Sequence, residues 1–203
     1  MAVRRSCISI AFCLVMVPTV AAADSPKASA LSLFTSFKTI CVDTSAVPYA
    51  ANARAKEAGG KILPWPDGVI EPPPITGTIW ENVLVGGSKF TVATGEYQGS
   101  WPPDWEGWAD ICAITGEVRD DESISSIRNW AGVAADPTSS SETYYFQIVG
   151  EHHLPLPDDL AQRHALEQRG KVWVLEVSSG PSPNVTWVHH LAPGERHQLP
   201  ARE

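Results

Sequence analysis

The sequence predicts an α+β protein with two N-terminal helices packed on a largely antiparallel sheet. Before residue 60 the apolar residues recur at helical spacing, whereas from Ile75 onward they tend to alternate with a period of two, which is typical of strands. The predicted order is two helices, about three strands, a helix, a strand, a short helix and two strands. This order favours one α+β domain with antiparallel pairing.

Residues 1–23 have the three-part layout of a secretory signal peptide. Arg4 and Arg5 form a positive n-region, residues 8–20 are mostly apolar, and residues 21–23 are three alanines. The apolar run is shorter than the roughly 20 residues that a membrane span needs, so an uncleaved anchor is the less favoured alternative. We therefore expect the chain to be exported.

Cleavage after residue 23 would leave an acidic chain of 180 residues. It removes two of the 15 basic residues and none of the 23 acidic ones, so the net charge changes from -8 to -10. An acidic chain without a basic run is a poor candidate for binding nucleic acid or an anionic membrane. No second apolar segment of spanning length follows, so we expect no membrane span after cleavage.

Two cysteines, Cys41 and Cys112, remain after cleavage because Cys7 and Cys13 lie in the signal peptide. In an oxidising compartment an even pair predicts one disulfide bond. The chain-entropy model gives such a loop roughly 4 kcal/mol of stabilisation. The alternative is a catalytic thiol, but neither cysteine lies in a C-x-x-C or another nucleophile motif.

The N-terminal part of the domain predicts two helices and a proline-rich connection. Residues 31–42 carry apolar side chains at spacings of three and four, with Cys41 on the apolar side. Residues 48–58 are rich in alanine and begin with a proline, which suits the first turn of a helix. Residues 61–74 contain five prolines, so we expect an ordered crossover loop there.

Strand patterns dominate the rest of the chain. Residues 75–85 and 89–94 flank a Gly-Gly pair and predict a hairpin, and residues 108–115 predict a third strand. Asp120 and Gly132 bracket a predicted helix. The remaining predicted elements are strands at 144–149, 171–177 and 184–191 and a short helix at 158–170. We place the single domain at 31–192, after a linker at 24–30 and before a polar tail at 193–203.

The densest chemical feature is the segment 101–110, which holds three tryptophans and three acids and which we expect to be a loop. Flat indole faces can stack on the apolar faces of a sugar while carboxylates accept its hydroxyls. The predicted ligand-binding residues are Trp101, Trp105, Trp108, Asp104 and Glu106. The favoured interpretation, however, is that the tryptophans are buried and hold the loop over one end of the sheet. In a third interpretation, two of its acids, Asp110 included, form a glycosidase pair.

Two histidine pairs, His152–His153 and His189–His190, follow or end predicted strands. Adjacent residues on a strand point to opposite faces, so each pair could give one ligand to a shared site, with Glu151 as a candidate partner. No zinc-binding spacing, G-x-S-x-G or phosphate-binding loop occurs. We therefore assign no catalytic residue, no metal site and no cofactor.

The N-terminal helix pair carries a resemblance to known proteins. Residues 37–44, with their cysteine, and the Ala-rich stretch 50–60 resemble a group of small uncharacterised exported bacterial proteins. In that group a Cys-bearing helix and an Ala-rich helix ending in Gly precede a β-rich remainder. The resemblance covers about residues 34–60, and Gly60–Lys61 departs from it where the group tends to have an aromatic residue. It implies a bacterial periplasmic setting and no catalytic residues.

These observations predict a periplasmic or secreted protein that acts as a non-enzymatic binding or interaction module. Its partner would be a small molecule, a glycan or a protein. The first alternative is a periplasmic hydrolase that acts on a carbohydrate or cell-envelope substrate through segment 101–110. The second is an interaction protein whose partner meets an exposed sheet edge.

Overall fold

The computed structural model describes residues 32–63, 75–101, 105–139 and 141–195. The predicted signal peptide, the linker and the end of the polar tail lie outside these residues. In chain order the elements are α1 (Ser32–Phe37), the π-helical turn η1 (Lys38–Val42), α2 (Pro48–Glu57), β1 (Lys61–Leu63), β2 (Ile75–Val85), β3 (Ser88–Trp101), β4 (Trp105–Gly116), α3 (Asp121–Ala131), β5 (Glu142–Val149), β6 (His152–Pro155), α4 (Leu160–Glu167), β7 (Val172–Ser178) and β8 (Asn184–His190).

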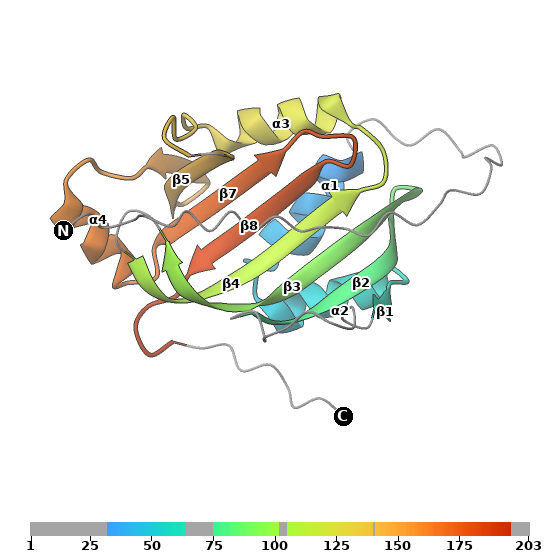
Figure 1. The fold of residues 1–203 in the computed structure, drawn as a ribbon, viewed down its shortest axis with the longest axis horizontal. Coiled ribbons are helices and arrows are strands. Elements are labelled where there is room, and N and C mark those ends of the chain that lie inside the picture. Colours follow the sequence, from blue (N-terminus) through green and yellow to red (C-terminus); the bar gives the residue numbers. More distant parts are fainter. Residues whose placement is uncertain (1–31, 64–74, 102–104, 140, 196–203) are drawn as a thin grey trace, which may run out of the picture.

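The sheet contains eight strands in the described part of the chain, and each neighbouring pair is antiparallel. The strand order is β1-β2-β3-β4-β8-β7-β5-β6, so the long strands β3 and β4 lie near the centre and β8 inserts between β4 and β7 (Figure 1). The predicted α+β class and antiparallel sheet are confirmed.

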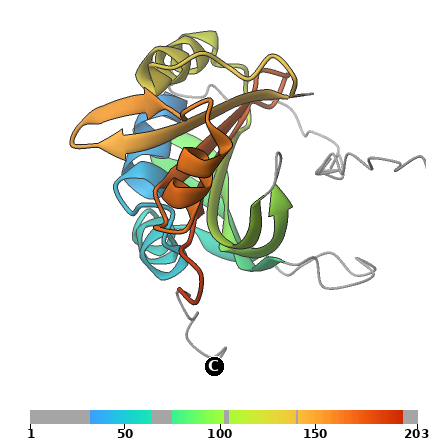
Figure 2. The same ribbon diagram turned by 90° about the vertical axis from the view of Figure 1, so that its left-hand side faces the viewer.

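One face of the sheet carries the main hydrophobic core, and both N-terminal helical segments lie on this side (Figure 2). Residues directly opposite on antiparallel strands share a face. Trp80, Val92, Ile114 and Val185 form such a row across four strands, and all are buried. They belong to one cluster with Phe37 of the first helical segment, which joins residues from both ends of the chain.

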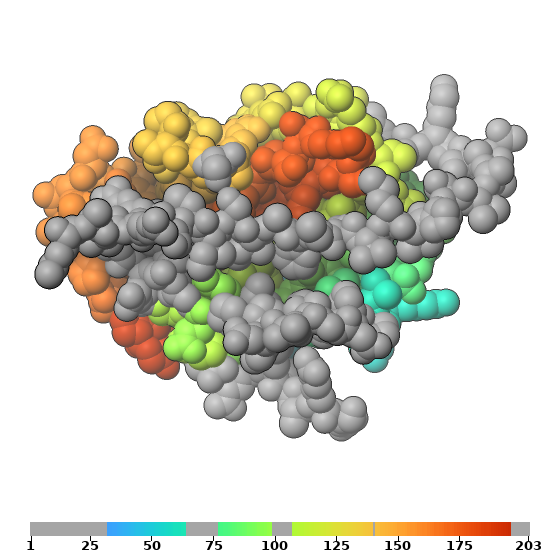
Figure 3. Space-filling view, in the orientation of Figure 1, coloured from blue at the N-terminus to red at the C-terminus, as the bar shows by residue number. Residues whose placement is uncertain are grey.

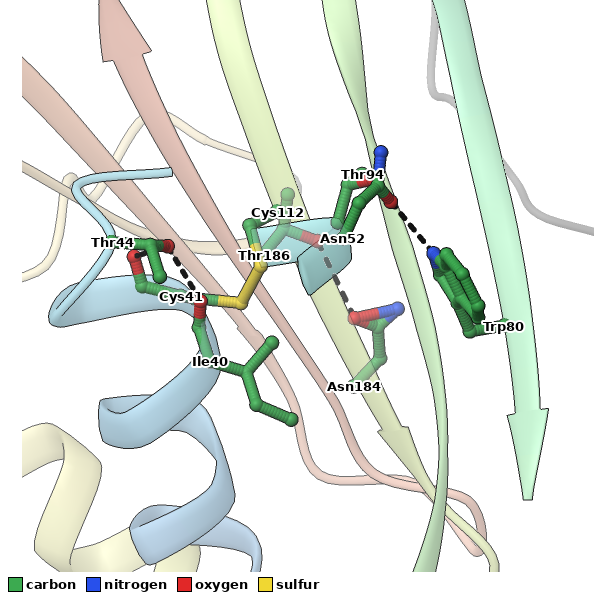
Figure 4. The surroundings of a disulfide bond; sticks show 9 residues. All are labelled: Ile40, Cys41, Thr44, Asn52, Trp80, Thr94, Cys112, Asn184 and Thr186. Carbon is green, nitrogen blue, oxygen red and sulfur yellow. Dashed lines mark hydrogen bonds between the residues drawn. A yellow bond between two sulfur atoms is a disulfide. The ribbon is translucent and has the colours of Figure 1, made fainter. Parts of the chain in front are cut away.

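A disulfide bond joins Cys41 to Cys112, as predicted, with 5.4 Å between the Cα atoms (Figure 4). Cys112 lies inside β4, and Cys41 lies in the π-helical turn that continues α1. The wider turn is closed by the Asp43 N–H, which donates to the Lys38 carbonyl at 2.8 Å. The predicted single helix at 31–42 thus has regular α geometry only in its first half.

The ends of α2 and α3 follow the sequence signals. Pro48 opens α2, and the side chain of Asp120 caps α3 by accepting from the Ser123 N–H at 2.9 Å. Gly132 follows α3 at φ +66°, the left-handed conformation that glycine adopts without steric cost. Asn52 of α2 accepts hydrogen bonds from Trp80 Nε1 and Thr94 Oγ1, both at 2.6 Å (Figure 4).

Two local predictions were wrong, and one short strand was not predicted. Lys61–Leu63 is strand β1 rather than loop, although residues 64–74 of the predicted crossover lie outside the described residues. Residue 101 and residues 105–110 of the predicted loop are strand, because β3 runs to Trp101 and β4 begins at Trp105, whereas residues 102–104 lie outside the described residues. Residues 152–155 form the edge strand β6, which pairs with β5 through a two-residue turn. Alternation over only four residues is too short to reveal such a strand.

Candidate functional site

The far end of the β3–β4 hairpin extends beyond its neighbouring strands. In the described residues, β2 begins opposite Tyr97 and β8 ends opposite Ala109. From Gln98 to Trp101 and from Trp105 to Trp108, therefore, β3 and β4 pair as strands only with each other. We call these two stretches the hairpin end. Figure 2 shows this end of the hairpin bending away from the N-terminal helices.

Four of the five predicted ligand-binding residues map to this hairpin end. Trp101 and Trp105 are direct partners in the register, Glu106 is the partner of Ser100, and Trp108 is the partner of Gln98. Trp108 is half-buried. Asp104 lies between the two strands, outside the described residues. The register thus brings the three tryptophans onto one short length of hairpin.

A glycine pair and one backbone contact mark the base of the hairpin end. Gly99 and Gly107 are direct partners, so neither strand has a side chain to pack at that step. Glycine inside a strand often marks a bend. The Leu191 N–H donates to the Trp108 carbonyl at 2.9 Å, just past the end of β8. Within the described residues, the contact between the hairpin and β8 therefore ends at Trp108, and the remaining hairpin extends from it.

Three polar side chains form a row across the sheet next to the hairpin end. Asp110 on β4 is the direct partner of Glu96 on β3 and of His189 on β8. Glu96 is 1% exposed and Asp110 is 0% exposed. Cys112 lies two residues after Asp110, so this row lies on the face that carries the main core. We call Glu96, Asp110 and His189 the polar row.

His189 is held by an aromatic and a backbone partner. Its ring stacks on Trp173 with 3.9 Å between ring centroids and 7° between planes. Its Nε2 donates to the Gly170 carbonyl at 3.0 Å, because a carbonyl can only accept. Trp173 in turn stacks on Trp187 at 4.9 Å. The polar row therefore continues into the aromatic core.

The two histidines of each pair have different surroundings. His190 is the partner of Ala109 and lies on the opposite face from His189. Burial, and next the neighbouring His189, lower the pKa of His190 to about 3, so its ring is neutral at physiological pH. His153 Nδ1 donates to the Trp130 and Ala131 carbonyls at 3.0 and 3.1 Å, at the end of α3. Among the described residues, no group of three metal-ligating side chains is placed to hold a metal ion.

The sequence interpretation missed Glu96 and His189 as neighbours of Asp110. One signal was present for Glu96, because it continues the alternation of Phe90, Val92 and Thr94 and therefore falls on the buried side of the strand. No such signal exists for the pairing of β4 with β8, which brings together residues far apart in the chain. Asp110 itself is packed inside, away from the solvent that a substrate would come from.

Comparisons with known protein families, with curated proteins and with solved structures found no match. No helix in the described stretches of the chain is long and apolar enough to span a membrane. The resemblance to small exported bacterial proteins therefore stays a prediction from residues 34–60.

Proposed function

We propose that this chain is an exported, non-enzymatic binding module that presents the hairpin end to a glycan of the cell envelope. The observation that carries the proposal is the position of the three tryptophans. Trp101, Trp105 and Trp108 lie where, within the described residues, β3 and β4 pair as strands only with each other. A two-stranded hairpin that extends from a sheet has little core to bury large side chains in, so indoles there favour contact with a ligand.

The chemistry of the segment fits a carbohydrate. Indole faces cover the apolar faces of a sugar ring, and the carboxylates of Asp104 and Glu106 accept its hydroxyls. An uncharged sugar needs no basic side chains for binding, which agrees with an acidic chain that lacks a basic run.

We infer that the two N-terminal helices pack on the sheet and hold it rigid behind the hairpin end. The Cys41–Cys112 bond and the two hydrogen bonds to Asn52 support this inference. Asn52→Ala would leave the buried Trp80 indole N–H without its acceptor, at a cost of about 1–3 kcal/mol. Urea unfolding measures the loss, and Asn129→Ala on an exposed site of α3 is the control.

Binding is tested with the purified protein on a glycan array and against purified cell-envelope polysaccharide. We expect Trp105→Ala and Trp108→Ala each to weaken binding by about tenfold or more, the loss expected for an aromatic anchor. Tyr49→Ala is the matched control, because Tyr49 is an aromatic residue that is 55% exposed on α2. Equal binding by all three variants would contradict the proposal.

Export is tested separately by mass spectrometry of the protein from a periplasmic extract or culture medium. A mature chain that begins at Asp24 is the expected result. A chain that keeps residues 1–23 in the cytoplasm would contradict it.

The alternative of a carbohydrate hydrolase has one favourable observation, the acids of segment 101–110 beside its tryptophans. Asp110 is fully buried, which leaves Asp104 and Glu106 as the candidate pair. A reducing-sugar assay on the bound polysaccharide separates the two functions. Product release that Glu106→Gln abolishes would favour the hydrolase, whereas binding without release favours the module.

A further inference from the structure

Both ends of the first helical segment are bonded to other elements, one by hydrogen bonds and the other by the disulfide. We call Ser32–Val42 the latch, which comprises α1 and η1. Its side chains Leu33, Phe37 and Ile40 are each no more than 1% exposed. At its C-terminal end, Cys41 is bonded to Cys112 of β4.

The N-terminal end of the latch is held by the start of α3. Asp120 Oδ2 accepts from the Leu33 N–H at 3.3 Å and from the Ser32 hydroxyl at 3.4 Å. Ser123 Oγ accepts from the Phe34 N–H at 3.1 Å and donates to Asp120 Oδ2 at 2.6 Å. Asp120 Oδ1 meanwhile caps α3 itself. The Asp120 carboxylate therefore accepts hydrogen bonds at the N-termini of both α1 and α3.

Both cysteines of the disulfide are buried. Cys41 and Cys112 are both 0% exposed. Cys112 lies in the middle of the sheet, with Thr94 and Trp187 as its direct partners. Cys41 itself belongs to the latch, so the bond and the latch are buried together on the core side of the sheet.

We propose that Ser32–Val42 is a redox-controlled latch, which docks firmly only after the Cys41–Cys112 bond has formed and then shields that bond from reduction. Closing the bond oxidises both thiols and reduces an oxidised thiol–disulfide exchange partner. The S–S bond of the partner breaks, the S–S bond between Cys41 and Cys112 forms, and the two thiol protons end on the partner's sulfurs. The atoms and electrons balance in this exchange.

The physical basis is the length of chain between the two cysteines. They are 71 residues apart, and the bond joins the latch directly to β4. Without the bond, the contacts that hold the latch within the described residues are its hydrogen bonds with Asp120 and Ser123 at the start of α3 and its buried apolar side chains. A segment that loses its covalent bond to the sheet can open before the whole molecule unfolds. In a reducing cytosol the latch would stay open and the core incomplete until export. The opening of the latch before export rests on the proposed function, whereas the dependence of the latch on the disulfide does not.

The first test measures how fast a phosphine reductant cleaves the bond in the folded, oxidised protein, with thiol alkylation as the readout. Asp120→Asn keeps an oxygen to cap α3 but cannot accept from the Leu33 N–H if its amide nitrogen replaces Oδ2. We expect reduction about tenfold faster than in the wild type. This is the size of effect that a lost helix cap produces, and here the lost hydrogen bond is the one at the start of α1. Asp121→Asn is the matched control and should reduce at the wild-type rate.

Two results of that test would overturn the proposal. One is a wild-type bond that reduces as fast in the folded protein as in urea. The other is an Asp120→Asn variant that reduces at the wild-type rate.

The second test compares hydrogen exchange in the oxidised and reduced protein. We expect reduction to remove protection from residues 32–42 and to leave β7 and β8 protected. Retained protection of the latch, or equal loss across the sheet, would contradict the proposal. Neither test depends on where the protein is located. A chain that is not exported would therefore not contradict the latch itself and would remove only its proposed role during export.

Discussion

Strand β4 passes through two regions of the molecule that differ in construction. At Cys112 it lies between β3 and β8, beneath the latch, and the cysteine is fully buried. At Trp105–Trp108 it pairs as a strand with β3 alone within the described residues. Both regions are rich in tryptophan. In the region around Cys112, the ring of Trp187 contacts four other aromatic rings, with 4.9–6.0 Å between ring centroids. These rings belong to Phe37, Trp130, Phe146 and Trp173.

The comparison predicts that removing a tryptophan has different consequences in the two regions. A large ring enclosed by other rings leaves a cavity when it is removed, and the cavity destabilises the fold. For a ring on the hairpin end, we expect removal to affect contact with a ligand more than folding. Figure 3 shows one face of the molecule, with β7 and β8 next to α3 among the described residues.

The largest expected effect comes from Trp187→Ala. Trp187 is 1% exposed and lies at the centre of the aromatic cluster, so its removal should cost about 3–5 kcal/mol of unfolding free energy. Urea denaturation followed by circular dichroism measures the loss. A cost under about 1 kcal/mol would contradict the central position of this ring.

Removing the disulfide should have the next largest effect. The double variant Cys41→Ala with Cys112→Ala should lose about 2–4 kcal/mol, because the unfolded chain regains the freedom of a long loop. Thermal unfolding measures the change, and the wild type in phosphine after prior reduction in urea serves as the comparison. Equal stability of the double variant and the oxidised wild type would show that the bond does not stabilise the fold.

A smaller, pH-dependent effect is expected at the edge of the core. The Arg128 guanidinium, which donates two hydrogen bonds to Glu142 at 2.7 Å, lowers the pKa of that carboxyl below its ordinary value of 4.5. Because the folded-state pKa is lower, the ionised carboxylate stabilises the fold above pH 4.5. This contribution is lost as the pH falls through the folded-state pKa. The pair is partly exposed, so its contribution is less than about 1 kcal/mol.

The variant Glu142→Gln tests this pH effect. It should remove the part of the acid destabilisation between pH 5 and pH 3 that belongs to this carboxylate. Glu57→Gln, in the exposed pair with Arg54, is the control. Parallel pH–stability curves for the wild type and Glu142→Gln would contradict the prediction.

The smallest effect on stability is expected at the hairpin end. Trp105→Ala should change the unfolding free energy by no more than about 0.5 kcal/mol, the usual size for sites outside a core. The contrast with Trp187→Ala in the same urea experiment tests the difference between the two regions directly. A loss of several kcal/mol would mean that Trp105 is a core residue and would favour the buried-tryptophan interpretation of segment 101–110.

Local signals in the sequence predicted most of the elements. Pro48, Asp120 and Gly132 mark helix ends in the structure because caps and fixed dihedrals act within a few residues. The hairpin at Gly86–Gly87 follows from the same kind of signal. The extension of β3 and β4 into the tryptophan segment was missed, because prolines at 102 and 103 suggested a loop.

The sequence by itself determined the α+β class, the antiparallel pairing and the disulfide partners. Periodicity and cap residues are local, and the two cysteines outside the predicted signal peptide allow one bond. Only the tertiary structure decided that β8 lies beside β4, which places His189 next to Asp110 and Trp187 next to Cys112. It also decided that Asp120 accepts a hydrogen bond from the first turn of the latch. These contacts join residues some 70 to 90 positions apart, and their free energy depends on the whole core rather than on any local pattern.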